Sequence, residues 1–191
     1  DELLNLLYEI YDLERLCGRI SLGTANGKDL IQLKNSLKIL PEINNILNKI
    51  NFKSLPDISN LYNLLESSLY EDPPATLKEG YLIKTGYNEE LDTLKDLRSG
   101  GKEFISTLEQ SEKEKTGIQN LKVGFNKVFG YYIEVSKGQC NLVKDEYGYE
   151  RKQTLANCER FSTPLLKEKE NIILGAEEKI ISLEYKLFMD I

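Results

Sequence analysis

The sequence predicts a mainly α-helical protein with a small β-rich segment inserted between two long helices. Apolar side chains recur every three or four residues over most of the chain, which is the spacing of an amphipathic helix. After Gly117 the period changes to two, as in a β-strand, and it returns to the helical value at Thr163. The two flanking stretches repeat apolar positions every seven residues, which is typical of long helices that pack along each other.

The first 70 residues are predicted to form three helical segments. One covers 2–22, and a second covers 28–50 with a break at Pro41, because proline cannot donate the intrahelical hydrogen bond. Asp57 is the expected N-cap of the third segment. Asp72-Pro73-Pro74 then rules out a helix, and residues 77–87 fit a small hairpin or an extended loop.

Two long helices are expected to form an antiparallel arm. The first begins at the cap Asn88 and ends near Lys115, and the second begins with Thr163 as N-cap and Pro164 at the first helical position. About 27 residues at 1.5 Å each give an arm of roughly 40 Å. Gly100-Gly101 is its weak point, at about 1 kcal/mol per glycine relative to alanine. The seven-residue repeats comprise Leu94, Gly101, Leu108, Leu166, Ile173, Ile180 and Leu187.

Between the long helices, alternating residues predict a β-hairpin. Residues 121–125 and 129–135 form its strands around Asn126-Lys127-Val128, and a third extended stretch is expected near 149–155. The β unit would then lie at the tip of the arm. This is the geometry of a lever with a gripping end, and it differs from the central concave pocket of an enzyme.

The charge of the chain is unevenly distributed. The formal net charge is −6, yet residues 117–163 contain seven Lys or Arg and five Asp or Glu, so this segment carries +2 and the remainder −8. Any contact with a polyanion should therefore be local. The basic residues are interspersed with Asn, Gln and Thr, which donate hydrogen bonds to phosphate oxygens. The alternative is that these lysines only keep a sheet edge soluble.

Residue types exclude most catalytic chemistry. Without histidine there is no Ser-His-Asp or Cys-His site and no His-containing zinc site. Gly18 to Thr24 has the glycine spacing of a phosphate-binding loop but lacks its lysine, and follows a helix. The carboxylate pairs Glu112/Glu114 and Glu177/Glu178 are expected on exposed helix faces. We therefore expect a protein that is not an enzyme and that holds no cofactor or metal.

Three cysteines and the absence of targeting signals bear on location. Cys17, Cys140 and Cys158 are far apart, so we expect buried, reduced thiols of a cytosolic protein. No apolar run approaches the ~20 residues of a membrane helix, and the acidic start does not resemble a signal peptide. The lack of an initiator methionine suggests a mature product or an excised fragment.

Four separated motifs occur in order along the chain, at 12–26, 86–92, 116–135 and 151–161. Together they resemble the MutS family of DNA mismatch-repair proteins. Two are similar to the clamp region of that family: TGIQNLKVGFN with FGYYIEV (116–126 and 129–135), and RKQTLANCERF (151–161). Asp12-Leu13-Glu14-Arg15, Arg19-Ile20 and Ala25-Asn26 look like the start of its core domain. Gly86-Tyr87-Asn88 with Glu90-Leu91-Asp92 resembles the start of its long arm helix.

The resemblance implies a core or lever domain at 1–103, a β-rich DNA clamp with the end of the arm helix at 104–163, and the returning arm helix at 164–191. It implies contact with the backbone of double-stranded DNA, without sequence readout and coupled to the ATPase of a parent protein. The mismatch-reading and ATPase domains, the latter holding ATP and Mg²⁺, would lie outside this chain. A second MutS subunit and a MutL-like protein are the implied partners, with no membrane, and a cytoplasmic, nucleoid-associated location if the source is bacterial.

By the same resemblance, the basic pair of the clamp falls on Arg151 and Lys152 and the clamp asparagine on Asn157. We expect Lys152 and Asn157 to contact phosphates, with weaker contributions from Lys127 and Lys137. Lysine at 152, where the family often has arginine, keeps a point charge but loses the bidentate fork. The alternative function is a helical scaffold that binds a protein without direct DNA contact.

Overall fold

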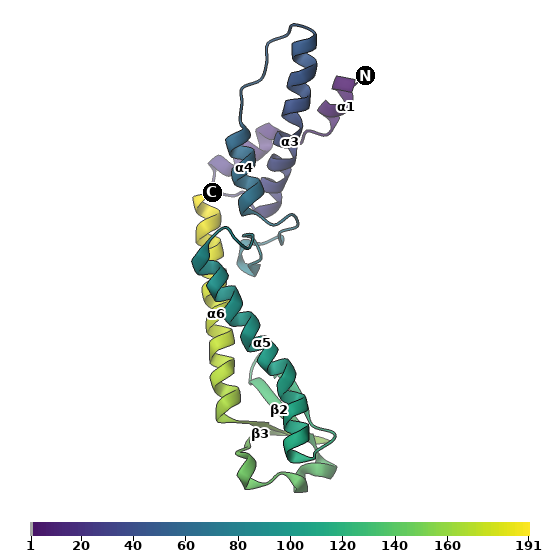
Figure 1. Cartoon of the computed structure of the whole chain (residues 1–191), viewed down its shortest axis with the longest axis vertical. Helices are drawn as coiled ribbons and strands as arrows, with labels where there is room; N and C mark the ends of the chain where they lie inside the picture. Colours follow the sequence, from purple (N-terminus) through teal and green to yellow (C-terminus); the bar gives the residue numbers. More distant parts are fainter. Residues whose placement is uncertain (1) are drawn as a thin grey trace. The chain divides into compact units, whose positions relative to one another are not determined.

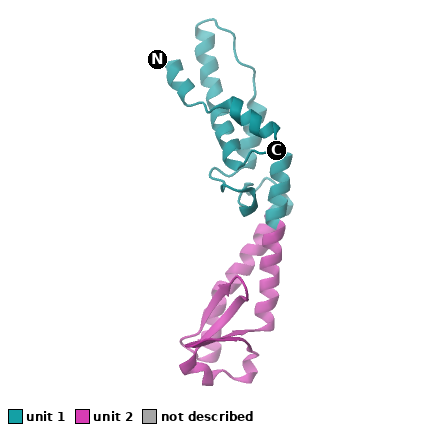
Figure 2. Cartoon of the chain, turned by 180° about the vertical axis from the view of Figure 1, so that it is seen from behind, with its two compact units in different colours: residues 1–91, 180–191 teal, residues 92–179 magenta. Residues whose placement is uncertain are grey.

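The structure is a computed structural model that describes residues 2–191. It is mainly helical and contains one four-stranded antiparallel sheet, which confirms the predicted mainly α class. Two compact units are present: residues 1–91 with 180–191 (unit 1), and residues 92–179 (unit 2) (Figure 2). None of the described helices is both long enough and apolar enough to cross a membrane.

Unit 1 is built from helices and loops. It contains α1 (Glu2–Tyr8), α2 (Leu13–Ser21), α3 (Gly27–Lys49), α4 (Ser59–Ser68), the short 3-10 helix η1 (Leu77–Glu79), the start of α5 (Glu89–Thr116) and the end of α6 (Pro164–Asp190) (Figure 1). The segment predicted as a hairpin or loop contains η1 and one isolated antiparallel bridge between Leu69 and Ile83.

Two predicted helices of unit 1 are wrong in their extent. The segment 2–22 is divided between α1 and α2, because Asp12 caps α2 by accepting a hydrogen bond of 2.9 Å from the backbone N–H of Arg15. The break expected at Pro41 is absent, and α3 continues through it. Leu37 and Ile43 are buried on either side of the proline, so packing offsets its cost of about 3 kcal/mol.

The predicted cap Asp57 does not occupy the N-cap position of α4. That position belongs to Ile58, whose side chain makes no capping hydrogen bond. Asp57 lies one residue earlier and accepts a hydrogen bond of 2.9 Å from the backbone N–H of Ser59. It therefore stabilises the start of the helix without capping it in the expected register.

Unit 2 combines the sheet with the facing parts of α5 and α6. The strand order is β1-β2-β4-β3, with β1 (Lys122–Asn126), β2 (Gly130–Ser136), β3 (Glu150–Thr154) and β4 (Cys158–Ser162). The 3-10 helices η2 (Lys137–Leu142) and η3 (Asp145–Tyr147) connect β2 to β3. The predicted hairpin and third strand are confirmed. Strand β4 was not predicted, although it lies inside the sheet and pairs on both sides.

The ends of the long helices agree with their predicted caps. Asn88 accepts a hydrogen bond of 2.9 Å from the N–H of Leu91, and the Thr163 hydroxyl accepts one of 3.1 Å from the N–H of Leu166. Within unit 2, Gly101 lies against Ile173 and the Lys102 ammonium lies 2.9 Å from the Glu177 carboxylate. One face of the sheet packs on both helices through a core of Leu108, Ile118, Leu121, Ile133, Val135, Phe161 and Leu166.

Candidate nucleic-acid interface

On the face of the sheet that points away from the helices, polar side chains form hydrogen bonds and ion pairs with one another. On β4, Arg160 donates a hydrogen bond of 2.9 Å to the Glu134 carboxylate, and its guanidinium lies 4.1 Å from the centre of the Tyr132 ring. It also donates to Gln153 at 3.2 Å. The hydrogen bond with Glu134 raises the pKa of Arg160 above its ordinary value. Arg160 therefore consolidates this face, and its charge is already compensated.

Lys137 and Asn157 meet at one end of the sheet. The backbone N–H of Lys137 donates a hydrogen bond of 3.0 Å to the carbonyl of Asn157, directly beyond the last pair of β2 and β4. Both residues are exposed, and among residues 2–191 no carboxylate lies within 4.0 Å of the Lys137 ammonium. An uncompensated ammonium and a side-chain amide thus face solvent together.

Gln139 lies at the same end of the sheet. From the sequence it was only one of several Asn, Gln and Thr residues interspersed with the basic residues, and it was not selected as a site residue. Its side-chain oxygen accepts a hydrogen bond of 3.0 Å from the backbone N–H of Asn120. In the part of the chain that the structure describes, its NH₂ group donates to no protein acceptor. Only the fold reveals this, because the contact joins residues that are 19 positions apart.

Lys127 and Lys152 are placed at the other end, around the β1–β2 turn. Lys127 is exposed within the turn. Lys152 lies at the register shift between Arg151 and Gln153, and its ammonium donates a hydrogen bond of 3.0 Å to the Phe129 carbonyl. Because β2 has seven residues, the two ends of the sheet are separated by about 20 Å.

Within residues 2–191, Arg151 is the one predicted site residue that forms an ion pair. Its guanidinium lies 3.0 Å from a Glu159 carboxylate oxygen, which is largely buried. The structure therefore separates the five predicted residues into Lys137 with Asn157, Lys127 with Lys152, and a compensated Arg151.

The expectation that Glu112 is an exposed charge is wrong. Only 8% of the residue is accessible, and its carboxylate accepts a hydrogen bond of 2.6 Å from the hydroxyl of Tyr149. Burial, together with this hydrogen bond, raises the pKa of Tyr149 far above its ordinary value. The contact fastens the segment before β3 to the end of α5.

Replacing Tyr149 by phenylalanine should lower the free energy of unfolding by about 1.5–3 kcal/mol, because a buried carboxylate loses its neutral donor. The contribution of Tyr149 should be intact below pH 10 and decline above it, because the unfolded tyrosine ionises first. Urea unfolding of both proteins at pH 8 and above pH 10 measures this. Tyr147→Phe is the matched control, and an equal loss in that variant would contradict the assignment.

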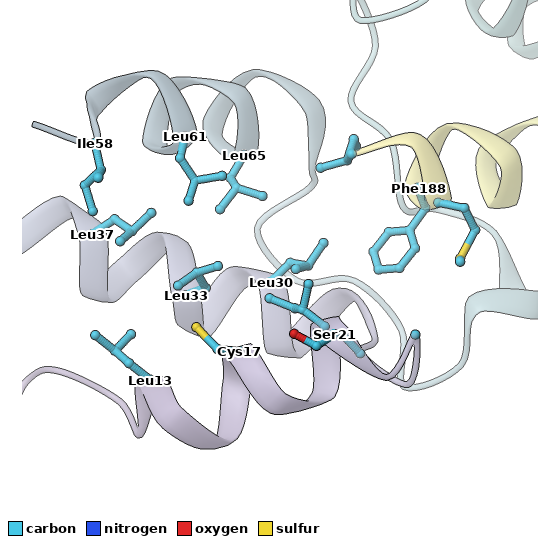
Figure 3. Close-up of a pocket in the computed structure, with 15 residues that line it drawn as sticks. Leu13, Cys17, Ser21, Leu30, Leu33, Leu37, Ile58, Leu61, Leu65 and Phe188 are labelled. Atoms are coloured by element: carbon cyan, nitrogen blue, oxygen red, sulfur yellow. The ribbon is translucent and has the colours of Figure 1, made fainter.

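An apolar groove of about 540 Å³ is a separate feature within unit 1. Figure 3 shows Leu13 and Cys17 of α2, Leu33 of α3, Leu65 of α4 and Phe188 of α6 around it. Among the described residues that line it, only Cys17 and Ser21 have polar side-chain groups, a thiol and a hydroxyl. The groove therefore suits apolar contact and offers no pair of groups for acid–base chemistry.

The predicted burial of all three thiols is also wrong. Cys17 is exposed at this groove, whereas Cys140 and Cys158 are partly buried, and all three are free. Burial raises the pKa of Cys140 and of Cys158. Across residues 2–191, no three Cys, Asp or Glu side chains are grouped so that they could hold a metal ion.

The sequence was also compared with those of known proteins. The model of MutS family domain IV matches residues 86–179. The chain is 53% identical to the DNA mismatch repair protein MutS of Bacillus pumilus over 98% of its length, 52% to that of Clostridium tetani and 51% to that of Bacillus subtilis over its full length. It spans 22–23% of these relatives, less than a quarter of their length. By its sequence along the whole chain, the protein belongs to the MutS family.

Proposed function

We propose that this chain is the DNA-binding clamp and lever portion of a MutS mismatch-repair protein, and that it grips the backbone of duplex DNA without reading sequence. The observation that carries the proposal is the juxtaposition of Lys137 and Asn157, which a backbone hydrogen bond brings together at an exposed end of the sheet. Gln139, two residues after Lys137, has a side-chain oxygen that accepts from the N–H of Asn120, and its NH₂ group is a further donor available to phosphate in this proposal.

The chemistry of this end suits phosphate oxygens. An ammonium without a carboxylate partner attracts phosphate, and side-chain amides donate hydrogen bonds to it. On the face of the sheet that does not pack on the helices, the Tyr132 ring is already covered by the Arg160 guanidinium at 4.1 Å, so it is not free to stack on an unpaired base. On this face, the charge of Arg160 is compensated by Glu134. The end of the sheet with Lys137 and Asn157 would therefore be the point of contact.

The long helices support the lever role. Gly101 lies against Ile173, and three residues further along α5 the Lys169 ammonium lies 5.3 Å from the centre of the Phe104 ring. The partner number on α6 thus falls as the α5 number rises, as expected for helices that run antiparallel within unit 2. Helix α6 continues without a break from residue 164 in unit 2 to residue 190 in unit 1. Movement of the parent protein could thus reach the sheet through a continuous helix.

The rest of the parent would supply ATP and Mg²⁺ binding, the second MutS subunit and the contact with a MutL-like protein, in the cytoplasm. This chain does not fit a nucleotide: Gly18 to Thr24 forms the end of α2 and the turn after it, and the segment lacks the phosphate-binding lysine. We accordingly propose a non-catalytic role.

Combined replacement Lys137→Glu with Asn157→Ala should weaken binding to duplex DNA at least about tenfold, because one phosphate contact becomes a repulsion. Fluorescence anisotropy at low salt measures this, with two unrelated duplexes of about 30 base pairs, or three helical turns. Wild type should bind both sequences equally. Lys144→Glu makes the same charge reversal on the same unit, at a lysine already paired with Glu146, and should change affinity less than about threefold.

An equal loss in the Lys144 control would reduce the effect to net charge and contradict the proposed contact. A marked preference for one duplex would contradict backbone binding. Failure of wild type to bind any duplex would favour the second candidate, a helical scaffold that binds a protein partner. The apolar groove of unit 1 is the observation in favour of that candidate.

A further inference from the structure

The β1–β2 turn, at the end of the sheet away from Lys137, is held by two oppositely charged side chains. The backbone N–H of Tyr131 donates to the carboxylate of Glu170 on α6. Two residues earlier in the chain, the carbonyl of Phe129 accepts the hydrogen bond from Lys152 on β3. The carboxylate of Glu170 thus accepts a hydrogen bond from a backbone N–H, and the ammonium of Lys152 donates one to a backbone carbonyl. Both hydrogen bonds are charge-assisted, because one partner in each is ionised.

Gly130, between these two contacts, shows how closely the turn approaches α6. Its φ angle is +76°, and a Cβ atom added there would overlap the Glu170 carboxylate. Glycine is needed at this position both for the left-handed backbone conformation and for the close approach. The Lys167–Glu150 ion pair adds a second link between α6 and the sheet.

Inside the turn, the side-chain oxygen of Asn126 accepts hydrogen bonds from the backbone N–H groups of Val128 at 2.8 Å and Phe129 at 3.3 Å, but these local contacts do not join the turn to α6 or to β3. Strand β1 is at the edge of the sheet and pairs only with β2. Val128 is 80% exposed and Phe129 is 45% exposed, so apolar burial contributes little to the position of the turn.

We propose that Glu170 and Lys152 are positioning residues: Glu170 fixes the β1–β2 turn to α6, Lys152 fixes it to β3, and together they set the orientation of the sheet on that helix. Lys152 acts in this role on the Phe129 carbonyl, and phosphate contact is left to Lys137. The consequence for DNA rests on the proposed function, whereas the anchoring of the turn does not.

Amide hydrogen exchange of the full 191-residue chain tests the anchor directly. Glu170→Ala and Lys152→Met should each accelerate exchange within 127–131 about tenfold or more, because each removes a charge-assisted hydrogen bond. Glu170→Gln retains a carbonyl acceptor and should restore most of the protection. Lys137→Met, the matched removal of a lysine charge, should leave exchange in the turn unchanged.

The salt dependence of duplex binding separates positioning from phosphate contact. Each phosphate contact contributes about 0.9 to the slope of log K against log salt concentration. Lys137→Met should reduce the slope by about that amount, and Lys152→Met should leave it unchanged while lowering affinity only a few-fold. A slope reduced in Lys152→Met, with exchange in the turn unaltered, would overturn the anchor. If neither the wild type nor any variant binds DNA, the proposed function fails. The hydrogen-exchange result alone then tests whether Glu170 and Lys152 hold the turn.

Discussion

Replacing Asp29 by asparagine should lower the free energy of unfolding by about 2–3 kcal/mol. Its carboxylate is 91% buried and accepts hydrogen bonds from the backbone N–H of Asn26 at 2.9 Å, Arg19 Nε at 2.8 Å and Arg15 at 3.4 Å. Breaking a buried pair typically costs about 3–5 kcal/mol. The loss should be smaller here because both arginines are 39–45% exposed and can turn to water.

The pH dependence of this variant provides an independent check. Burial alone would raise the pKa of Asp29, but hydrogen bonds from Asn26 and Arg19 outweigh it and hold the pKa below its ordinary value. The contribution is therefore present above the unfolded pKa near 3.8 and lost as the pH falls through the lower folded pKa. Urea unfolding should show the difference between wild type and Asp29→Asn at pH 7, and a shrinking difference in strong acid.

Asp72→Asn is the matched control, because Asp72 is exposed in the same unit and should change stability by less than about 0.5 kcal/mol. A difference for Asp29→Asn that stays constant down to strong acid would show that its charge is not the stabilising feature.

Gly101→Ala should destabilise the protein by about 1–2 kcal/mol, although alanine is the better helix former. The new Cβ atom would lie 2.5 Å from Cγ1 of Ile173, a side chain that is 1% exposed and cannot move aside freely. Overpacking of this kind costs about 1–3 kcal/mol, and the gain in helix propensity offsets about 1 kcal/mol of it. Thermal or urea unfolding measures the net effect.

The neighbouring glycine is an internal control. A Cβ atom at Gly100 would meet no atom within 4 Å, so Gly100→Ala should stabilise the protein by up to about 1 kcal/mol. In an Ile173→Ala background, Gly101→Ala should also become neutral or stabilising. Destabilisation by both alanines would mean that α5 needs flexible residues here, and would contradict the packing explanation.

The order of helices and strands could be read from local patterns, whereas features that depend on distant residues could not. The change of period at Gly117 and Thr163 locates the sheet, and Asn88 and Thr163 act as the caps that their residue types suggest. The continuation of α3 through Pro41 depends on tertiary packing, which local propensity cannot report. Strand β4 was missed because Cys158-Glu159-Arg160-Phe161 has little apolar alternation and owes its position to pairing with β2 and β3.

Charged residues were the hardest to interpret from sequence. Glu112 is buried because its partner Tyr149 is 37 positions away. Family resemblance and residue type selected Lys127, Lys137, Arg151, Lys152 and Asn157, but neither could show which of them meet. Register determines that Lys137 lies beside Asn157 and that Lys152 reaches Phe129. Likewise, Arg15, Arg19 and Asn26, part of the core-domain resemblance, converge on Asp29 and serve the fold of unit 1.

The most direct test of DNA contact at the Lys137 end is a lysine footprint. Brief acylation of the chain, with and without saturating duplex DNA, is followed by mass spectrometry of each modified lysine. We expect DNA to protect Lys137 several-fold, and to leave Lys144 and the unit 1 lysines, such as Lys53 and Lys78, unchanged. Equal protection at all exposed lysines, or protection confined to unit 1, would contradict the account.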